Sequence, residues 1–363
     1  MKNIAVFFGG VSVEHDVSVI TGVMTCNTLD KCVYNVYPVY IDESGEWFTG
    51  DALFDPDNYK DLDKKGLKRV TLFGGSNKLY AVKGKKVKEL CALSVAINCM
   101  HGERGEDGCL SGVLKMCGIA NASPDVYPSA LAMDKSITKR AVKGIANVLP
   151  FVVSGSPKEL RTKELPFDYP VIVKPLFGGS SIGIKIAENA DELVRAAEYG
   201  LRFGRRVIVE PCLKDFTEIN CAAYRNVEGI KVSECERPVR RTDILTFNDK
   251  YESGKRVFPA DIPDYIARRI KAITERVYRT FGFTGVIRID YFLVGKKVYL
   301  NEINSVPGSL AYYLFGETQK EFSVMLNEMV DLARIRFAEN QTIKTSYDSG
   351  ILKTSGSKSA KRL

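Results

Sequence analysis

The sequence predicts an α/β protein that begins with an open parallel sheet. From the first residue, strand and helix patterns alternate: "IAVFFGG" indicates a strand, the stretch after "VSVEHD" indicates a helix that ends near Leu29, and "VYNVYPVYI" and "LSVAINCM" indicate further strands. Such alternation is typical of a parallel sheet covered by helices. Ligands of these sheets bind at the loops that follow the strands. Glu14 and His101 lie in two such loops and are therefore candidate site residues.

The second half of the chain predicts strand pairs and an amphipathic helix. "YPVIVKPLFGGSSIGIKIAENADELV" indicates a strand, a Gly-rich turn, a second strand and a helix capped near Asn189. "TGVIRIDYFLV" and "KKVYLNEINSV" indicate an antiparallel hairpin, because few residues connect them. The segment "PDYIARRIKAITERVYRTFGF" has apolar residues at the spacing of one helix face, namely Ile266, Ile270, Ile273 and Val277.

Composition excludes several classes of protein. With 363 residues, 45% of them hydrophobic, the chain is long enough for two or three domains. It has no run of about 18 apolar residues, so we expect no membrane span. The apolar stretch in "MKNIAVFFGG" is too short for a signal peptide. The nine cysteines are scattered without a C-x-x-C pair, which indicates reduced thiols. We therefore predict a cytoplasmic protein.

The net charge of +8 is concentrated at the C-terminus. From Asn340 onward, five Lys or Arg residues and one Asp contribute +4, which is half of the total. A Ser/Thr/Lys-rich end of this kind predicts a disordered tail. Elsewhere no basic stripe with interleaved aromatic residues occurs, so we do not expect nucleic acid as a partner.

Four polar residues on the predicted hairpin suggest a metal site. Side chains two residues apart on a strand share a face, so Arg288 lies beside Asp290 and Glu302 beside Asn304. If the two faces coincide, two carboxylates and an amide oxygen converge next to an arginine. Hard oxygen ligands of this kind suit Mg²⁺. The alternative is a solvated polar face. The short, rigid side chains favour the metal.

Other motifs allow two interpretations each. In "KPLFGGSSIG", Lys174 precedes glycines and serines whose N–H and hydroxyl groups suit phosphate oxygens, but an ordinary hairpin turn has the same pattern. It is not a Walker loop, because G-x-x-x-x-G-K-[ST] is absent. Glu210 and Glu218 fit either nucleotide contacts or surface carboxylates. Likewise, His101 fits a structural role, and Glu14 fits a helix cap.

Together these segments resemble the ATP-grasp superfamily, and more closely the D-alanine–D-alanine ligase family. The resemblance covers residues 3 to 335, and its landmarks occur in order: "FFGGVSVEHDVSVITG", "MHGERGEDG", "SALAMDKSITK", "YPVIVKPLFGGSSIG", "VIVE", "FNDKY", "IRIDYF" and "NEINSVPG". It implies an α+β ATP-grasp fold behind the N-terminal sheet, with ATP held between the second and third domains. We accordingly predict a substrate domain over 1–124, ATP-grasp subdomains over 125–212 and 213–340, and the basic tail over 341–363.

The resemblance also implies roles for individual residues. Those at ATP would be Lys135, Lys174, Ser181, Glu210, Leu213, Glu218, Phe247 and Lys250. Two Mg²⁺ or Mn²⁺ ions would be held by Asp290, Glu302 and Asn304. The catalytic set would be Glu14, Ser180, Tyr251, Arg288 and Gly308, the last two forming an oxyanion hole. Substrate contacts would come from His101, Tyr312 and Tyr313, and Glu106 would support the loop that carries Lys250.

The sequence departs from the family pattern at three places. Phe247 precedes Lys250 by three residues, which is closer than the family's usual spacing. One extra residue lies between Glu210 and Glu218, which affects the implied ribose contact. Most important, counting from "NSVPG" places Tyr313 where the family usually has a serine that binds the carboxylate of the second substrate. The implied second substrate is therefore open.

Three functions follow from these observations. The first is an ATP-dependent ligase that joins two D-amino acids, most simply two D-alanines, through an acyl phosphate for peptidoglycan precursors. The second is a ligase of the same kind with another acceptor, such as D-serine, D-lactate or another amino acid. The third is a nucleotide-binding protein without ligase activity, which the complete set of Arg288, Asp290, Glu302 and Asn304 argues against. The resemblance also implies a homodimer.

Overall fold

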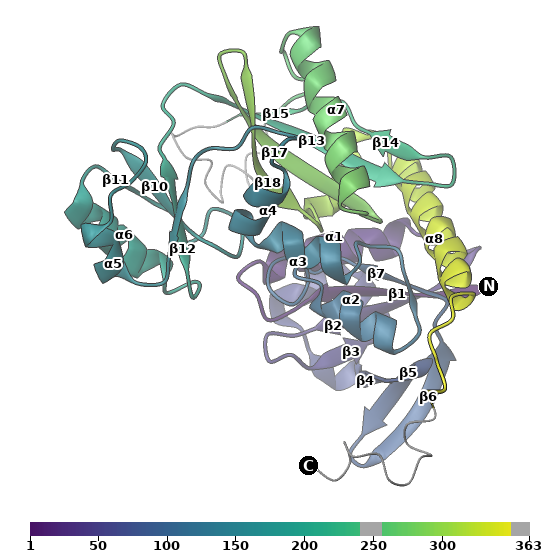
Figure 1. Cartoon of the computed structure of the whole chain (residues 1–363). Coiled ribbons are helices and arrows are strands. Elements are labelled where there is room, and N and C mark those ends of the chain that lie inside the picture. The colour runs from purple at the N-terminus through teal and green to yellow at the C-terminus, as the bar shows by residue number, and fades with distance from the viewer. Residues whose placement is uncertain (240–255, 350–363) are drawn as a thin grey trace.

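The computed structural model describes residues 1–239 and 256–349 (Figure 1). Three of the implied site residues, Phe247, Lys250 and Tyr251, lie outside this range, as does the end of the predicted tail from residue 350. The described residues form three larger sheets and one small one, surrounded by helices. The predicted α/β class is therefore confirmed. The predicted domain boundaries stay predictions.

The N-terminal sheet is mixed and not wholly parallel. Its order is β6-β5-β4-β3-β2-β1-β7-β8. The parallel half, which the sequence predicted, consists of β1 (Lys2–Gly9), β2 (Tyr34–Ile41), β7 (Val95–Asn98) and β8 (Ala120–Asn121). An antiparallel extension that was not predicted consists of β3 (Trp47–Thr49), β4 (Lys68–Phe73), β5 (Ser76–Lys83) and β6 (Lys86–Ala92). Three short 3₁₀ helices, η1 (Asp51–Phe54), η2 (Pro56–Asp61) and η3 (Lys64–Gly66), connect β3 to β4.

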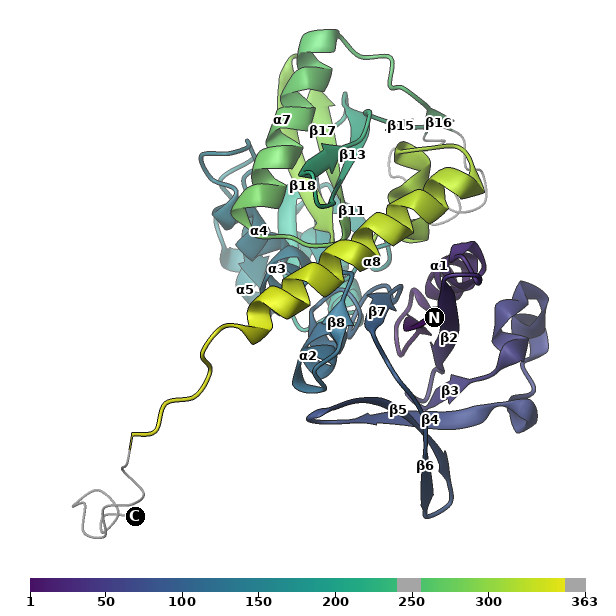
Figure 2. The same cartoon turned by 90° about the vertical axis from the view of Figure 1, so that its right-hand side faces the viewer.

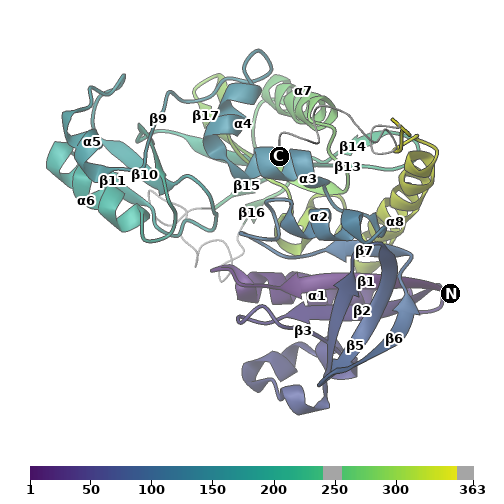
Figure 3. The same cartoon turned by 60° about the horizontal axis from the view of Figure 1, so that its bottom comes forward.

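Helices cover the parallel half of this sheet. The predicted first helix is confirmed as α1 (His15–Thr28), and it packs on β1 so closely that Gly22 lies against the ring of Phe8. Later in the chain come α2 (Cys109–Met116), α3 (Val126–Met133) and α4 (Lys135–Ala141). Figure 3 shows α1 and α2 lying along the β1–β7 region.

The central sheet has the order β11-β10-β12-β9 and is antiparallel throughout. Its strands are β9 (Val152–Ser154), β10 (Val171–Pro175), β11 (Lys185–Ala187) and β12 (Val207–Pro211). Two helices, α5 (Pro157–Thr162) and α6 (Ala190–Gly200), cover it, and Asn189 caps α6 as predicted. In Figures 1 and 3 this unit projects from the rest of the molecule.

The C-terminal sheet carries the predicted hairpin. Its order is β14-β13-β17-β18, formed by β13 (Thr217–Arg225), β14 (Ile230–Val232), β17 (Val286–Val294) and β18 (Lys297–Asn304). The predicted amphipathic helix is α7 (Asp264–Thr280), and its four predicted apolar residues are buried against the sheet. Beside β13 lies a small ladder of β15 (Arg237–Pro238) and β16 (Arg256–Val257).

One helix joins the first and last sheets. The long helix α8 (Gln319–Gln341) follows the 3₁₀ segment η5 (Gly308–Leu314) and crosses both sheets, as Figure 2 shows. Its residues Phe322 and Met325 share one apolar core with Ile4 of β1 and Tyr224 of β13. The shared core fixes the loops of the N-terminal sheet relative to the hairpin of the C-terminal sheet.

None of the helices in the described ranges, 1–239 and 256–349, has the length and apolar content needed to cross a bilayer.

The contact between α1 and β1 generates a stability prediction. A Cβ atom on Gly22 would lie 2.2 Å from Cγ of Phe8, so Gly22→Ala forces the helix away from the strand. Overpacking of this kind costs about 1–3 kcal/mol and outweighs the helix propensity that alanine adds. Gly112→Ala in α2 is the matched control, because its Cβ would meet nothing closer than 3.9 Å. We expect thermal denaturation to show a lower melting temperature for Gly22→Ala and an equal or higher one for Gly112→Ala. Equal melting temperatures for both variants would contradict this packing.

Candidate active site

The register of β17 and β18 gathers the predicted metal ligands. Asp290 pairs directly with Glu302, and Arg288 pairs with Asn304, so the two predicted faces coincide. The ladder is irregular immediately after Asp290, where Tyr291 pairs with Leu300 and Asn301 is left as an extra residue. A bulge of this kind allows two consecutive side chains to reach one side of a sheet.

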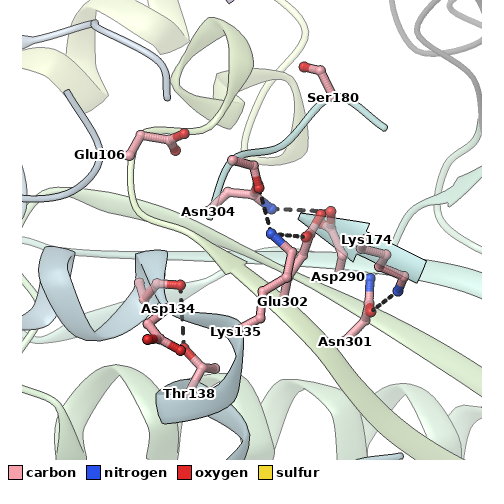
Figure 4. A network of polar contacts seen from close by, with 12 residues as sticks. Glu106, Asp134, Lys135, Thr138, Lys174, Ser180, Asp290, Asn301, Glu302 and Asn304 are labelled. Carbon is pink, nitrogen blue, oxygen red and sulfur yellow. Dashed lines mark hydrogen bonds and ion pairs between the residues drawn. The ribbon is translucent and has the colours of Figure 1, made fainter. Parts of the chain in front are cut away.

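Close polar contacts hold this cluster together (Figure 4). The guanidinium of Arg288 donates to both carboxylate oxygens of Asp290, at 2.7 and 3.0 Å. Asn304 donates from Nδ2 to the same carboxylate at 3.1 Å. Asp290 itself is 1% exposed, so its negative charge is compensated within the cluster by the arginine.

Two lysines approach the cluster from other elements. Lys135 is the first residue of α4, and its Nζ lies 3.4 Å from Glu302 Oε2 and donates to the carbonyl of Gly178. Asp134 fixes this position because its carboxylate caps α4 by accepting from the N–H groups of Ser136 and Ile137. Lys174, at the end of β10, lies 3.4 Å from Oδ1 of the bulge residue Asn301. Figure 4 shows both lysines directed toward the β18 residues.

A buried charge network lies behind the groove. Glu210 on β12 accepts from Lys174 at 2.8 Å and lies 2.7 Å from Nζ of Lys139 on α4, a side chain that is only 1% exposed. Burial raises the pKa of the Glu210 carboxyl, but the two lysines outweigh burial and bring that pKa down to about 2. Burial lowers the pKa of Lys139, against the effect of Glu210. The three groups stabilise one another's charged forms and fix β10, β12 and α4 together.

The Gly-rich turn meets the loop after the first strand. Ser180 donates a short hydrogen bond to Oε1 of Glu14, so residues 166 positions apart are joined. Glu14 occupies the N-cap position of α1, but its side chain does not cap the helix. Ser180 and Ser181 both have positive φ, a conformation that is uncommon for residues other than glycine. Backbone strain of this type is typical of ligand-binding loops.

His101 is buried and Glu106 is half-buried beside this junction. His101 Nε2 lies 2.9 Å from Oγ1 of Thr21, and burial lowers its pKa to about 4, so the ring is neutral at pH 7. Glu106 accepts from the N–H groups of Gly102 and Val306, at 2.9 and 3.1 Å. Burial, and then the nearby charge of Glu14, raise the pKa of Glu106 to about 8.

The segment after "NSVP" has an unusual backbone. Ser309, Leu310 and Ala311 all have φ near +50°, directly after Gly308. A left-handed conformation costs about 1–2 kcal/mol for each such residue. Burial of Leu310 and Ala311 offsets this cost, as does the hydrogen bond from Ser309 N to Thr21 Oγ1 at 3.0 Å. The strained turn places Gly308 at the edge of a cavity next to Arg288.

A cavity of about 300 Å³ brings together most of the residues that the sequence analysis assigned to substrate and catalysis, namely Glu14, His101, Ser180, Arg288, Gly308 and Tyr313. Its lining also contains Glu106, Glu218, which was assigned to ATP, and Asn304, which was assigned to the metal. Tyr312 is not in this lining. Its ring stacks on Phe322, with centroids 4.5 Å apart, and belongs to the apolar core.

A separate groove brings together residues that were assigned to ATP. Its lining contains Lys135, Lys174, Ser181, Glu218 and Glu302, together with the apolar Ile172, Ile184, Phe216 and Phe292. Glu210 and Leu213 do not line it: Glu210 is buried beneath it, and Leu213 lies just past the end of β12. Positive charge, a Gly-rich turn and an apolar wall suit phosphates at one end and a flat base at the other.

The sequence analysis missed four residues at this site. Lys139 follows Lys135 by one helical turn, and that spacing was the signal for it. Asn301 had no signal, because the bulge was not foreseen. Glu236 and Arg256 were also missed, since Glu236 forms an isolated bridge just before β15 and Arg256 begins the two-residue strand β16, neither of which the analysis predicted.

Asp290, Glu302 and Asn304 are the described residues that fit a divalent cation. Among the described residues, no group of three His, Cys, Asp or Glu side chains lies close enough to hold a metal. The candidate set instead has two carboxylates from paired positions and one amide oxygen. Mg²⁺ is commonly held by one or two carboxylates plus the phosphates of a substrate, so this donor set fits it.

The buried network around Glu210 gives a second prediction. Glu210→Gln leaves Lys139 and Lys174 buried without a counter-charge, which costs about 3–5 kcal/mol. The matched control is Glu275→Gln, whose partner Arg279 is exposed, and it costs at most about 1 kcal/mol. Because the folded pKa of Glu210 is about 2, the contribution of Glu210 is present above the unfolded pKa of about 4.3. It is lost as the pH falls toward 2. Urea unfolding at pH 7 measures the difference, and equal midpoints for the two variants would rule out a stabilising role for the network.

Comparison with known proteins agrees with this geometry. A family model described as D-ala D-ala ligase N-terminus matches residues 3–123, and one described as D-ala D-ala ligase C-terminus matches residues 148–332. A D-alanine–D-alanine ligase of Thermosipho melanesiensis is 36% identical over 369 residues, covering 97% of this chain and 99% of that protein. D-alanine–D-alanine ligase A of Escherichia coli K12 is 30% identical, covering 94% of this chain and 98% of that protein.

A solved structure also resembles the whole chain. The crystal structure of D-alanine–D-alanine ligase from Helicobacter pylori superposes with a TM-score of 0.76 at 26% identity, covering 91% of this chain and 98% of that one. The residues matched by the family models, by the two relatives and by this structure include the sheets that form the cavity and the groove. The chain therefore belongs to the D-alanine–D-alanine ligase family.

Proposed function

We propose that this protein is an ATP-dependent ligase that joins two D-alanines into a dipeptide for peptidoglycan precursors. One observation carries the proposal beyond family membership: the β17–β18 register places Arg288, Asp290, Glu302 and Asn304 on one face. That face lies between the groove that suits ATP and the cavity that suits an amino acid. Phosphoryl transfer between two substrates requires this adjacency.

The proposed reaction has two steps. A carboxylate oxygen of the first D-alanine attacks the γ-phosphorus of ATP, ADP leaves, and an acyl phosphate forms. The amine of the second D-alanine, after losing a proton, attacks the acyl carbon, and the tetrahedral intermediate expels phosphate. The products are ADP, phosphate and D-alanyl-D-alanine. The protein forms no covalent bond, so its contribution is positioning and charge stabilisation.

Charge complementarity supports the proposed assignments. Lys135 and Lys174 would contact the phosphates, and the hydrogen bond from Ser180 to Glu14 would join the phosphate loop to the first substrate's ammonium group. The neutral ring of His101 beside Glu14 avoids placing a second positive charge near that ammonium group. Mg²⁺ held by Asp290, Glu302 and Asn304 would neutralise charge on the transferred phosphate.

The oxyanion would be stabilised by Arg288 and the backbone N–H of Gly308. Both line the cavity, and Asp290 orients the guanidinium through two hydrogen bonds. The strained turn at residues 309–311 holds Gly308 in position. Loss of one oxyanion donor typically slows an enzyme by about 10²–10³-fold, so these groups are large contributors.

Three further elements belong to the proposal. A cytoplasmic location fits a substrate such as ATP, and a homodimer is the assembly that the sequence resemblance implies. A different acceptor, such as D-serine, D-lactate or another amino acid, is the second candidate. It is favoured by Tyr313, whose bulky ring lies in the cavity at the position of the family's usual serine.

The test is a product assay with ATP, Mg²⁺ and D-alanine. We expect ADP, phosphate and D-alanyl-D-alanine in equal amounts, quantified by coupled assay and mass spectrometry. Product that forms only when D-alanine is mixed with another D-amino acid or with D-lactate would establish the second candidate. No ATP turnover with any D- or L-amino acid, alone or in pairs, would contradict ligase activity.

A further inference from the structure

An ion pair between a buried glutamate and a half-buried arginine lines the cavity and has no role in the reaction as described above. Glu236 follows β14 and is 4% exposed, and Arg256 begins β16, with its side chain 30% exposed. Glu236 Oε1 and Arg256 Nη1 are 3.5 Å apart, longer than a normal hydrogen bond between charged groups. Both residues line the cavity that contains Arg288 and Gly308.

Glu236 continues a row of polar residues that pair across the C-terminal sheet, namely Asn220, Asp290 and Glu302. It exchanges two backbone hydrogen bonds with Asn220, each of 2.9 Å, and Asn220 pairs in turn with Asp290. The side chain of Asn220 donates from Nδ2 to Glu236 Oε2 at 3.2 Å. Among the described residues, Oδ1 of Asn220 has no hydrogen-bond partner although the residue is 5% exposed. A buried acceptor without a partner is costly, and here it lies in the lining of a cavity.

Tyr313 holds Arg256 in place. The carbonyl oxygen of Tyr313 accepts from Arg256 Nη1 at 3.1 Å, and the guanidinium lies 4.8 Å from the centre of the tyrosine ring. Phe258 supports the guanidinium from a second direction, at 5.2 Å. Within the described residues, Nε and Nη2 of Arg256 make no hydrogen bond to the protein. The guanidinium is therefore oriented by the Tyr313 carbonyl and by two aromatic rings.

Given the ligase function proposed above, we propose that Glu236 and Arg256 form the recognition site for the second substrate. In this site the Glu236 carboxylate receives the acceptor's ammonium group, with Asn220 Oδ1 beside it, and Arg256 receives the acceptor's carboxylate. An amino acid carries these two groups on neighbouring atoms, so its charges match a loose, side-by-side Glu–Arg pair. Tyr313 serves here as the platform for the arginine.

A purely structural ion pair would be arranged differently. A buried pair compensates its desolvation only with close geometry, and these two groups are 3.5 Å apart, while their hydrogen bonds go to Asn220 and Tyr313 and not to each other. Arg288 does not neutralise Glu236 through a direct contact, because both carboxylate oxygens of Asp290 hold its guanidinium. Burial raises the pKa of Glu236 even though Arg288 and Arg256 lower it. A bound ammonium group would supply the missing positive charge.

The site predicts the chemical class of the acceptor. A free α-amino acid satisfies both charged groups. D-lactate lacks the ammonium group, and D-alaninamide lacks the carboxylate. A site built around buried polar groups discriminates strongly against a ligand that leaves one of them unpaired. The acceptor is therefore a zwitterionic D-amino acid, and neither a hydroxy acid nor an amide is used efficiently.

Two variants test this inference against matched controls. Glu236→Gln removes one charge and keeps the shape of the side chain, and Arg256→Gln removes one charge and shortens the side chain. Glu234→Gln and Arg237→Gln are the controls, because both residues are close to Glu236 in the sequence but do not line the cavity. Glu234 pairs with Lys271, and Arg237 pairs with Asp261. Initial rates over a wide range of D-alanine concentration give separate KM values for the first and the second molecule. Hydroxylamine trapping of the acyl phosphate reports the first step alone.

We expect both cavity variants to raise the KM of the second D-alanine by about 10–100-fold, the loss of one charged hydrogen bond. Hydroxamate formation from the first step should stay at the wild-type rate, as should the melting temperature. The controls should match the wild type in every measurement. Relative to D-alanine, D-lactate should become a better acceptor in Glu236→Gln.

The outcomes separate this inference from the proposed function. If the wild type makes no dipeptide and no acyl phosphate, the ligase function itself is wrong. If the wild type is active but both variants keep its second KM, Glu236 and Arg256 do not bind the acceptor. If both variants lose hydroxamate formation together with dipeptide synthesis, they act on the whole site and the acceptor assignment is overturned.

Discussion

The cross-strand register of β17 and β18 is the constraint on which the site depends. It pairs Asp290 with Glu302 and Arg288 with Asn304, and a shift of one residue would turn every one of these side chains into the apolar core. The bulge at Asn301 adds a further contact, because it allows a second consecutive residue to reach Lys174. Burial of Ile289, Ile303 and Tyr291 on the opposite face holds this register in place.

Charge balance connects the sheets around this hairpin. Three acids near the groove have cationic partners: Asp290 has Arg288 on its own strand, Glu302 has Lys135 on α4, and Glu210 has Lys139 on α4 and Lys174 on β10. These ion pairs connect α4 to β18, and α4 and β10 to β12, next to the groove. The apolar core that α8 shares with the first and last sheets then fixes the N-terminal loops relative to these elements. Substrate positioning, which is the main task of such an enzyme, is thus built into the packing.

Much of this site could be predicted from the sequence because period-two spacing on strands determines which side chains share a face. That rule placed Arg288 beside Asp290 and Glu302 beside Asn304, and helical spacing predicted α7, but only the observed register shows that the two strand faces coincide. The rule did not predict the position of Asn301, because a bulge depends on how two strands pair and cannot be predicted from the local sequence pattern. It also missed the antiparallel extension β3–β6. Glu236 and Arg256 could not be predicted, since Glu236 is placed by an isolated bridge to Asn220 and Arg256 by a two-residue ladder and a tertiary contact with Tyr313.

The central claim is that the polar face of β17 and β18 is the platform for phosphoryl transfer. Its most direct test is anomalous X-ray scattering from crystals grown with Mn²⁺ and an ATP analogue that resists hydrolysis. We expect manganese peaks within coordination distance of oxygen atoms of Asp290, Glu302 and Asn304, with the nucleotide phosphates completing the coordination. Manganese bound to the phosphates elsewhere, with none of these three side chains as a ligand, would contradict the claim.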